Sequence, residues 1–223
     1  MRRDTIAARR AGRGADERAR RREQIVQAAV RAIEEHGSGA GLGAVADQAG
    51  LPRPHVYRHF ASKDDLDQEV ARLVARRLSS WIRPALTARG TPPKVVHGII
   101  GRVLEWAVDH PHLYRFRARL GQFAAVPELS RAGVAYLRAA GYDIRPPTYV
   151  VAGVIGMVDA SILWWFDHPE ELDRAALNDR LAAQVWLIFA DLLDHIGRPL
   201  DPAGELTPVG DTDRWKPPPG PSG

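Results

Sequence analysis

The sequence predicts an all-α protein of about nine helices, with a three-helix unit near the N-terminus and a larger helical body after it. Apolar residues recur at helical spacing along most of the 223-residue chain, and proline and glycine fall at the ends of these segments. The alternating pattern of a strand is not found. We assign the three-helix unit to residues 16–63 and the body to residues 64–197. The arginine-rich residues 1–15 and the proline- and glycine-rich residues 198–223 are expected to be disordered.

The first predicted helix runs from about Asp16 to His36. Its apolar residues fall on one stripe, which consists of Ile25, Ala28, Ala29, Ala32 and Ile33. This spacing is typical of an amphipathic helix that packs against its neighbours.

The stretch from Leu42 to Lys63 has the pattern of a helix-turn-helix. A short apolar helix ends at Gly50, where helices commonly close with a left-handed residue. Pro52 and Pro54 then fall in the first turn of a second short helix, where a missing amide hydrogen is tolerated. The polar side chains left to point outward from that helix are Arg53, His55, Arg58 and His59. A helix-turn-helix with a basic outer face predicts contact with nucleic acid.

Positive charge is concentrated in the same part of the chain. Residues 1–63 hold 13 Lys and Arg against 7 Asp and Glu, whereas residues 64–223 hold 18 against 20. A polyanion is therefore the expected partner of the N-terminal part. A basic terminus that is merely solvated is the alternative.

Composition and segment lengths exclude several other classes. The chain has no cysteine, so it has no disulfide framework and no thiol chemistry. Its arginine-rich start is not followed by the apolar core of a secretory signal. Thr148–Phe166 is apolar enough to resemble a membrane span, but Asp159 near its centre would cost about 2.5–3.5 kcal/mol in a bilayer. We expect a cytoplasmic protein without a membrane segment.

The body contains the patterns of six further helices. Ser62 and Asp65 predict a capping box at the start of the first of these helices. This helix should break near Pro84. The second begins after Thr91, at a pair of prolines. The remaining four are predicted at about 113–120, 127–141, 146–166 and 173–196.

Five pairs of residues follow a known signature in order and spacing: Val45-Ala46, Gly50-Leu51, Val56-Tyr57, His59-Phe60 and Ser62-Lys63. On these pairs, within residues 20–66, the chain resembles the TetR family of transcriptional regulators. The helix before the motif and the run of helices after it fit the same family. The chain departs from the pattern where Gly41 replaces a helix-capping threonine, and where Pro52, Pro54 and His55 replace a serine, a small residue and a threonine.

The resemblance implies a role for each exposed side chain of the second short helix. Tyr57 and Lys63 would contact DNA phosphates. The candidates for contacts with bases are Arg53, His55, Arg58 and His59. We expect Arg53 or Arg58 to read the operator, because a planar guanidinium can pair with O6 and N7 of guanine.

In this family, the last two long helices form a four-helix interface with a second subunit. The resemblance therefore implies a homodimer through helices 148–166 and 173–196, both of which are strongly apolar. Two copies of the reading helix would then face an inverted-repeat operator in double-stranded DNA.

The middle helices of the family enclose an effector, whose binding releases DNA from a repressor. Repression is the commoner mode in the family and is the expectation here. Abundant aromatic residues favour a small apolar or aromatic effector. The candidate pocket residues are Trp81, His97, Trp106, Phe116, Arg117, Phe123, Tyr136, Met157, Trp164 and Trp165.

Two other classes of function stay open from the sequence alone. A non-specific architectural DNA-binding protein would share the basic arm and the helix-turn-helix. A metal-binding helical enzyme would draw its ligands from one of two groups, Asp109, His110 and His112 or Asp191, Asp194 and His195. Because no nucleophile elbow, phosphate loop or zinc-protease motif is found, we expect no enzyme, no catalytic residue, no metal site and no cofactor.

Overall fold

The computed structural model describes the backbone of residues 2–120, 123 and 125–208, and side chains from residue 14 onward within those ranges. This part of the chain forms nine α-helices, one 3-10 helix and no β-strand, which confirms the all-α fold. In chain order the elements are α1 (Arg2–His36), α2 (Leu42–Ala49), α3 (Arg53–Tyr57), α4 (Lys63–Ile82), η1 (Arg83–Thr87), α5 (Pro92–Asp109), α6 (Pro111–Leu120), α7 (Val126–Ala139), α8 (Thr148–Asp167) and α9 (Arg174–His195).

The chain divides into two compact units, which are described separately. The first consists of residues 1–75 and 110–121, and the second of residues 76–109 and 122–223. The first unit contains the helix-turn-helix, α2 and α3. The second contains η1, α5 and α7 to α9.

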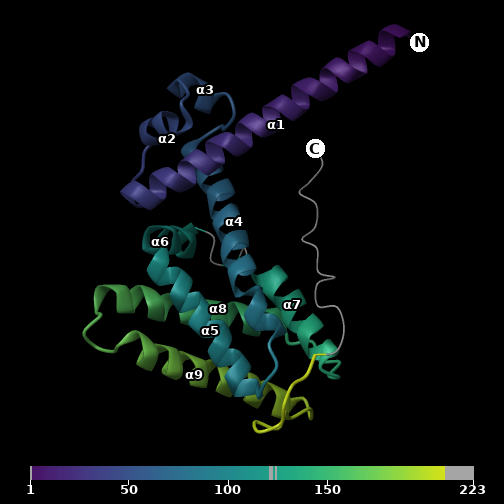
Figure 1. The fold of residues 1–223 in the computed structure, drawn as a ribbon, viewed down its shortest axis with the longest axis vertical. Coiled ribbons are helices and arrows are strands. Elements are labelled where there is room, and N and C mark those ends of the chain that lie inside the picture. The colour runs from purple at the N-terminus through teal and green to yellow at the C-terminus, as the bar shows by residue number, and fades with distance from the viewer. Residues whose placement is uncertain (1, 121–122, 124, 209–223) are drawn as a thin grey trace. The chain divides into compact units, whose positions relative to one another are not determined.

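In the first unit, α2 packs on α1 and on α3, and α6 packs on α1 (Figure 1). The apolar stripe predicted for the first helix is buried throughout, with each member at most 1% exposed: Ile25, Ala28, Ala29, Ala32 and Ile33. Val45, Val56 and Phe60 from the helix-turn-helix are buried as well. Helix α3 is therefore supported by a packed apolar core.

Local capping fixes the bounds of the short helices. Gly50 adopts a φ of 63°, and the amide that follows it donates to the carbonyl of Ala46 (3.0 Å). This conformation favours glycine because it has no Cβ. At the start of α4, the amide of Asp65 donates to Oγ of Ser62 (3.1 Å), as the capping box predicts. The Asp65 carboxylate reaches back to the amide of Ala61 (3.2 Å), one residue earlier than that motif requires.

Helix α1 begins at Arg2, so residues 2–15 are helical, which corrects the expectation of a disordered arm. The expectation of disorder rested on the charge density and the glycines of this segment. Arginine and alanine dominate the segment, however, and both are among the strongest helix formers. Further along α1, Glu17 pairs with Arg20 (2.5 Å) and with Arg21 (3.5 Å). Such pairs between successive turns each stabilise a helix by about 0.2–0.5 kcal/mol.

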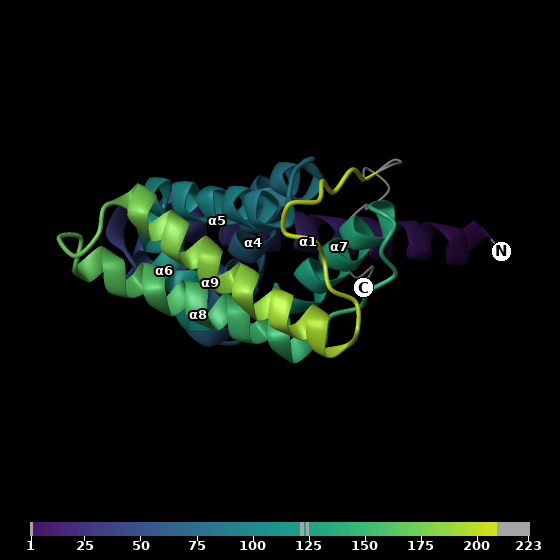
Figure 2. The ribbon, with the colours of Figure 1, turned by 90° about the horizontal axis from the view of Figure 1, so that it is seen from below.

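In the second unit, α5 packs along α9 and against η1, and α7 packs against α8 and η1 (Figure 2). The α-helical part of α4 ends at Ile82, and the chain continues as η1. This is the break predicted near Pro84, where the ring and the missing amide hydrogen oppose an α-helix. Helix α9 follows Asp173, whose carboxylate accepts from the amide of Ala176 (2.8 Å) and caps the helix.

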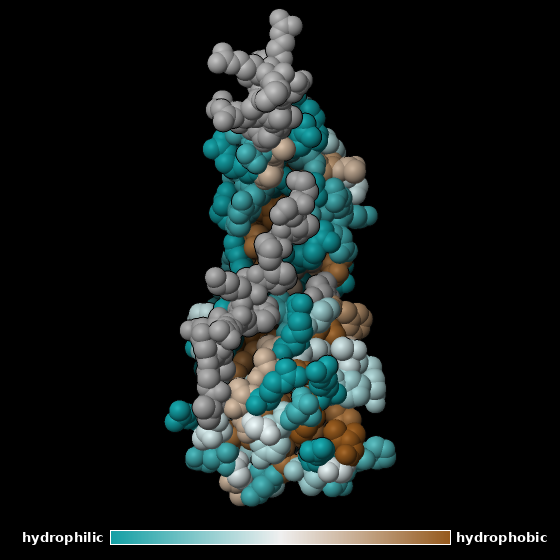
Figure 3. Space-filling model, turned by 90° about the vertical axis from the view of Figure 1, so that its right-hand side faces the viewer, coloured by the Kyte–Doolittle hydropathy of each residue, from teal (hydrophilic) through white to brown (hydrophobic). Residues whose placement is uncertain are grey.

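Helices α8 and α9 expose an unusual amount of apolar surface. Within the described residues, α8 is the one helix long and apolar enough to cross a membrane, and 22% of its apolar window is buried. Tyr149, Trp164 and Leu187 are 74%, 57% and 65% exposed. Figure 3 likewise shows hydrophobic side chains reaching the surface of the second unit. Asp159, near the middle of α8, is buried. An apolar face of this kind marks an interaction surface.

Leu206 is buried in the second unit and Leu200 packs beside it, so the disorder expected from residue 198 onward is wrong at these two residues. Residues 209–223 lie outside the described part of the chain. Leu206 exchanges two backbone hydrogen bonds with Gly90 (2.9 and 3.2 Å). Its side chain is buried with apolar side chains of α5 and α7. Composition cannot reveal such a contact, because one leucine in a proline-rich segment has no periodicity.

Replacement of Leu206 by alanine should lower the free energy of unfolding by about 2–3 kcal/mol, because it empties a site shared with Val95 and Tyr136. Urea denaturation followed by circular dichroism measures this change. The matched control is Glu205→Ala at the exposed neighbouring position, which should stay within about 0.5 kcal/mol of the wild type. Equal midpoints for Leu206→Ala and the wild type would show that the segment does not hold to the unit in solution.

Candidate DNA-binding surface

Helix α3 buries one side chain and presents the others. Val56 is 1% exposed, whereas Tyr57 is 59% exposed. Arg53, His55 and Arg58 are exposed as well. Four of the six predicted DNA contacts therefore share the outer side of one short helix and its last turn, where they are accessible to a ligand as large as a duplex.

Arg22 of α1 fixes the segment that follows α3. Its Cζ lies 4.1 Å from the centre of the Phe60 ring, and its Nη1 donates to the carbonyl of His59. Its Nη2 is 3.3 Å from a carboxylate oxygen of Asp65 and 3.1 Å from one of Glu69. Two anions and a ring thus surround one guanidinium. Sequence patterns gave no sign of this role, because Arg22 is one of a run of arginines.

His59 is half-buried and lies among cations. Burial lowers the pKa of its imidazole below the usual 6.5, and the positive charges of Arg58, Arg18, Arg21 and Arg22 lower it further. At neutral pH the ring is therefore mostly uncharged, with one donor and one acceptor nitrogen. Three of these four arginines, Arg18, Arg21 and Arg22, belong to α1, so this helix adds positive charge beside this histidine, just after α3.

The side chain of Lys63 already has a partner within the protein, unlike a lysine that is free to bind phosphate. Its Nζ lies 2.6 and 2.7 Å from the two carboxylate oxygens of Asp67, one helical turn along α4. The ammonium group is thus already paired, and a phosphate would share it with the carboxylate. Sequence spacing allows this i,i+4 pair but does not require it.

Arg53 extends from the start of α3 toward the first turn of α2. Its guanidinium lies against Gly43, where a Cβ atom would be 2.4 Å from Nη2. The N-cap of α2 is Gly41, so no side chain caps that helix. The resemblance leads one to expect a capping threonine at this position. Because glycine replaces it, the N-terminus of α2 has no side-chain cap.

The predicted effector-pocket residues do not gather in one place. In the second unit, Trp106 and Tyr136 are buried, and the Tyr136 hydroxyl donates to a backbone carbonyl of the segment before α5 (3.0 Å). His97 lies on the surface and bonds to Asp179 (2.9 Å). Phe123 is exposed.

The other candidates are similarly scattered. In the first unit, Phe116 and Arg117 are buried. In the second, Met157 is half-buried, and Trp81 lies under the guanidinium of Arg102, 4.8 Å from its ring centre.

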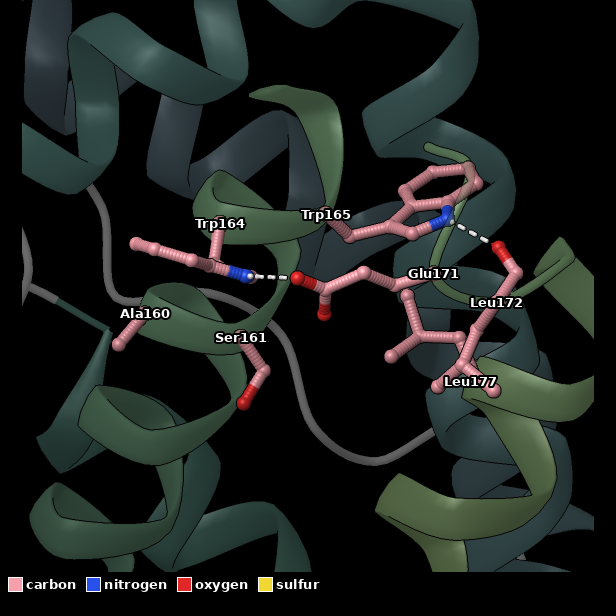
Figure 4. A pocket seen from close by; sticks show the side chains of 7 residues that line it. All are labelled: Ala160, Ser161, Trp164, Trp165, Glu171, Leu172 and Leu177. Atoms are coloured by element: carbon pink, nitrogen blue, oxygen red, sulfur yellow. Dashed lines mark hydrogen bonds between the residues drawn. The ribbon is translucent and has the colours of Figure 1, made fainter. Parts of the chain in front are cut away.

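Trp164 and Trp165 do line a common cavity, of about 350 Å³, beside the loop between α8 and α9 (Figure 4). The Trp165 indole nitrogen donates to the carbonyl of Leu172 (2.8 Å), and that of Trp164 donates to Glu171 (3.3 Å). Both indoles thus hold the loop in place. The cavity is open and mostly apolar, and the other predicted pocket residues do not reach it.

Two of the histidines considered as metal ligands, His110 and His112, contact Glu34 of α1. Nδ1 of His110 bonds to its carboxylate and Nδ1 of His112 lies 3.1 Å from its backbone carbonyl oxygen. Among the described side chains, no three His, Cys, Asp or Glu residues come together as a metal site. These histidines join α6 to α1 within the first unit.

Comparison with known proteins agrees with this geometry. Residues 25–70 match the family model of bacterial regulatory proteins of the tetR family. An uncharacterized HTH-type transcriptional regulator of Mycobacterium tuberculosis strain CDC 1551 is 25% identical over 192 residues, which cover 79% of this chain and 80% of the relative.

Two solved structures share the fold. A tetR-family transcriptional regulator from Streptomyces coelicolor has a TM-score of 0.59 at 21% identity, covering 79% of this chain and 83% of its own. RolR in complex with its ligand resorcinol has a TM-score of 0.57 at 16% identity, covering 85% and 100%. The family match spans the buried stripe of α1, the helix-turn-helix and the start of α4. Residues 25–70 thus match the tetR family of bacterial regulatory proteins, and the chain shares its fold with solved members of that family.

Proposed function

We propose that the chain is a repressor that binds an inverted-repeat operator as a homodimer and leaves it when a small apolar or aromatic effector binds. The observation that carries this proposal is the combination of an exposed basic α3 in the first unit with an uncovered apolar face on α8 and α9 in the second. The first feature fits DNA, and the second fits another copy of the chain.

The DNA contact is proposed for the outer face of α3 and for nearby arginines of α1. Arg53 and Arg58 are exposed, and neither guanidinium group forms a hydrogen bond or ion pair with other described residues. Their guanidinium groups are therefore available to base edges or phosphates. Tyr57 can present its hydroxyl to a phosphate while Val56 anchors the helix.

The dimer contact is proposed for α8 and α9. Burial of a large apolar side chain contributes about 1.5–3 kcal/mol, so covering Tyr149, Trp164 and Leu187 together would support a stable interface. Gly153 and Ala160 are exposed on α8 and allow a second helix to approach closely. Helix α9 also exposes polar side chains beside Leu187, a mixture that fits a protein partner better than lipid.

A two-fold dimer fixes the form of the operator. The two copies of α3 are related by the symmetry axis, so each half-site is read in the opposite direction. Half-site centres are then expected one helical turn of DNA apart, or a multiple of it.

The effector is proposed to bind in the second unit. RolR, whose fold is similar, has been solved with resorcinol bound, and the second unit of this chain is rich in tryptophan. A signal reaches the first unit through the segments where the chain passes between units, one of which is α4. An effector shifts DNA binding only by binding the two conformations with different affinities.

Arg53→Ala should weaken binding to the operator by about tenfold or more while changing the affinity for random DNA little, because a base contact carries sequence information. Lys63→Ala should weaken both alike, because a phosphate contact does not discriminate. Fluorescence anisotropy with the two duplexes over a range of salt concentrations measures both effects. Equal losses on operator and random DNA for Arg53→Ala would make Arg53 a phosphate contact.

Leu187→Arg should convert the protein to a monomer, because it places a charge in the proposed apolar interface of α9. Sedimentation velocity at micromolar concentration gives the mass. Lys94→Glu, an exposed charge change on α5, is the control and should leave the dimer intact. A wild-type protein that sediments as a monomer would remove the basis for an inverted-repeat operator.

A panel of planar phenols that includes resorcinol tests the effector class. A compound that binds the second unit should raise the melting temperature and, at saturation, lower operator affinity about 5–150-fold. Thermal shift identifies the binders, and gel shift on the operator measures release. A compound that raises the melting temperature but leaves operator affinity unchanged at saturation would contradict release by that compound.

A further inference from the structure

Gly43 and Arg53 lie against each other although they belong to different helices. Gly43 is the second residue of α2, and Arg53 is the first residue of α3. A Cβ atom on Gly43 would lie 2.4 Å from Nη2 of Arg53, 3.0 Å from its Cζ and 3.2 Å from its Nε. All three atoms belong to the guanidinium group. The planar group therefore covers the side of the α2 backbone that the missing side chain leaves open.

This contact leaves the donors of Arg53 unused. The side chain is exposed and forms no hydrogen bond or ion pair with other residues that the structure describes. Arg22 differs, because its guanidinium is surrounded by Asp65, Glu69 and the His59 carbonyl. Arg53 is thus oriented by shape, with its five N–H donors available to a ligand.

The orientation of an arginine side chain before binding affects how tightly it binds DNA. The free side chain samples many rotamers, and the entropy lost on ordering it opposes binding. A guanidinium group that already lies against α2 loses less conformational entropy when it binds. It also approaches the duplex from one direction, so its fork meets base edges in one geometry.

We propose that Gly43 is a positioning residue that determines operator specificity, by leaving room for the guanidinium of Arg53 against α2. The inference rests on the proposed function, because it requires Arg53 to read a base. Any side chain at position 43 displaces the group, since 2.4 Å is shorter than a non-bonded contact permits. The displaced atoms are the far end of a flexible side chain, so the fold itself has no need of the glycine.

Gly43→Ala separates this role from a structural one. Alanine is the better helix former, so α2 should be no less stable in the variant, and the melting temperature should not fall. Gly39→Ala is the matched control, because Gly39 is exposed and lies outside the helices, and a Cβ atom added there would have no neighbour within 4 Å. A loss of folding therefore cannot stand in for a loss of specificity.

The first measurement is affinity for the best duplex that the wild-type protein selects from a random pool. We expect Gly43→Ala to lose about tenfold on this duplex and less than about twofold on random DNA. Gly39→Ala should match the wild type on both. The duplexes selected by Gly43→Ala and by Arg53→Ala should differ from the wild-type site at the same positions of each half-site.

A double-mutant cycle tests whether Gly43 acts through Arg53. Added to Arg53→Ala, the substitution Gly43→Ala should change operator affinity by less than about twofold, because the group it displaces is already absent. A further tenfold loss in that background would overturn the proposal, and so would an unchanged site and affinity for Gly43→Ala alone.

The second measurement needs no DNA. Nitrogen-15 relaxation of the Arg53 Nε group should show restricted motion in the wild type and in Gly39→Ala, and faster, wider motion in Gly43→Ala. Equal mobility in all three proteins would overturn the positioning of Arg53. If the mobility differs as expected but the wild type selects no sequence, the proposed function fails, and the specificity assigned to Gly43 fails with it.

Discussion

The guanidinium of Arg22 is the interaction on which the DNA-binding unit depends. It lies over the Phe60 ring and between the carboxylates of Asp65 and Glu69, and it donates to the carbonyl of His59. It thereby joins α1 to the end of the reading helix and to the start of α4. A partly buried charge with several partners is worth more than an exposed ion pair. Loss of Arg22 would leave the Asp65 carboxylate without this cation, whereas Glu69 would keep its contact with Arg72 (3.3 Å).

The positive charges of this unit fall into two groups. Arg22 and Lys63 are neutralised within the protein, by Asp65, Glu69 and Asp67. The guanidinium groups of others, among them Arg18, Arg53 and Arg58, form no hydrogen bond or ion pair with described residues. The first group holds the reading helix in place and the second is available to DNA. Burial lowers the pKa of His59, and this density of positive charge lowers that pKa further. Net charge alone, as counted from the sequence, does not distinguish the two groups.

Features set by neighbouring residues could be predicted from the sequence. Gly50 ends α2, Ser62 caps α4, and the chain leaves the α-helical conformation near Pro84, because each depends on backbone sterics or a hydrogen bond within one turn. The stripe that begins at Ile25 is buried, because helical periodicity places its members on one face.

Features that join distant parts of the chain could not be predicted. Arg22 meets partners about 40 residues away, and Leu206 meets Gly90 across most of the second unit's sequence. The scattered positions of the expected pocket residues have the same cause, since aromatic content does not say which side chains converge. His97, for example, lies on the surface beside Asp179. The contact between Gly43 and Arg53 also depends on the angle between two helices, which no spacing in the sequence specifies.

The most direct test is to measure the mass of the protein–DNA complex and to determine the base sequence of the DNA site in it. Duplexes that bind the wild-type protein should be enriched from a random pool, and sedimentation of the complex on the enriched site should give its stoichiometry. The account predicts an inverted repeat with two protomers related by its centre, or an even multiple of two. A single protomer on an asymmetric site, or no enrichment of any sequence at low salt, would contradict it.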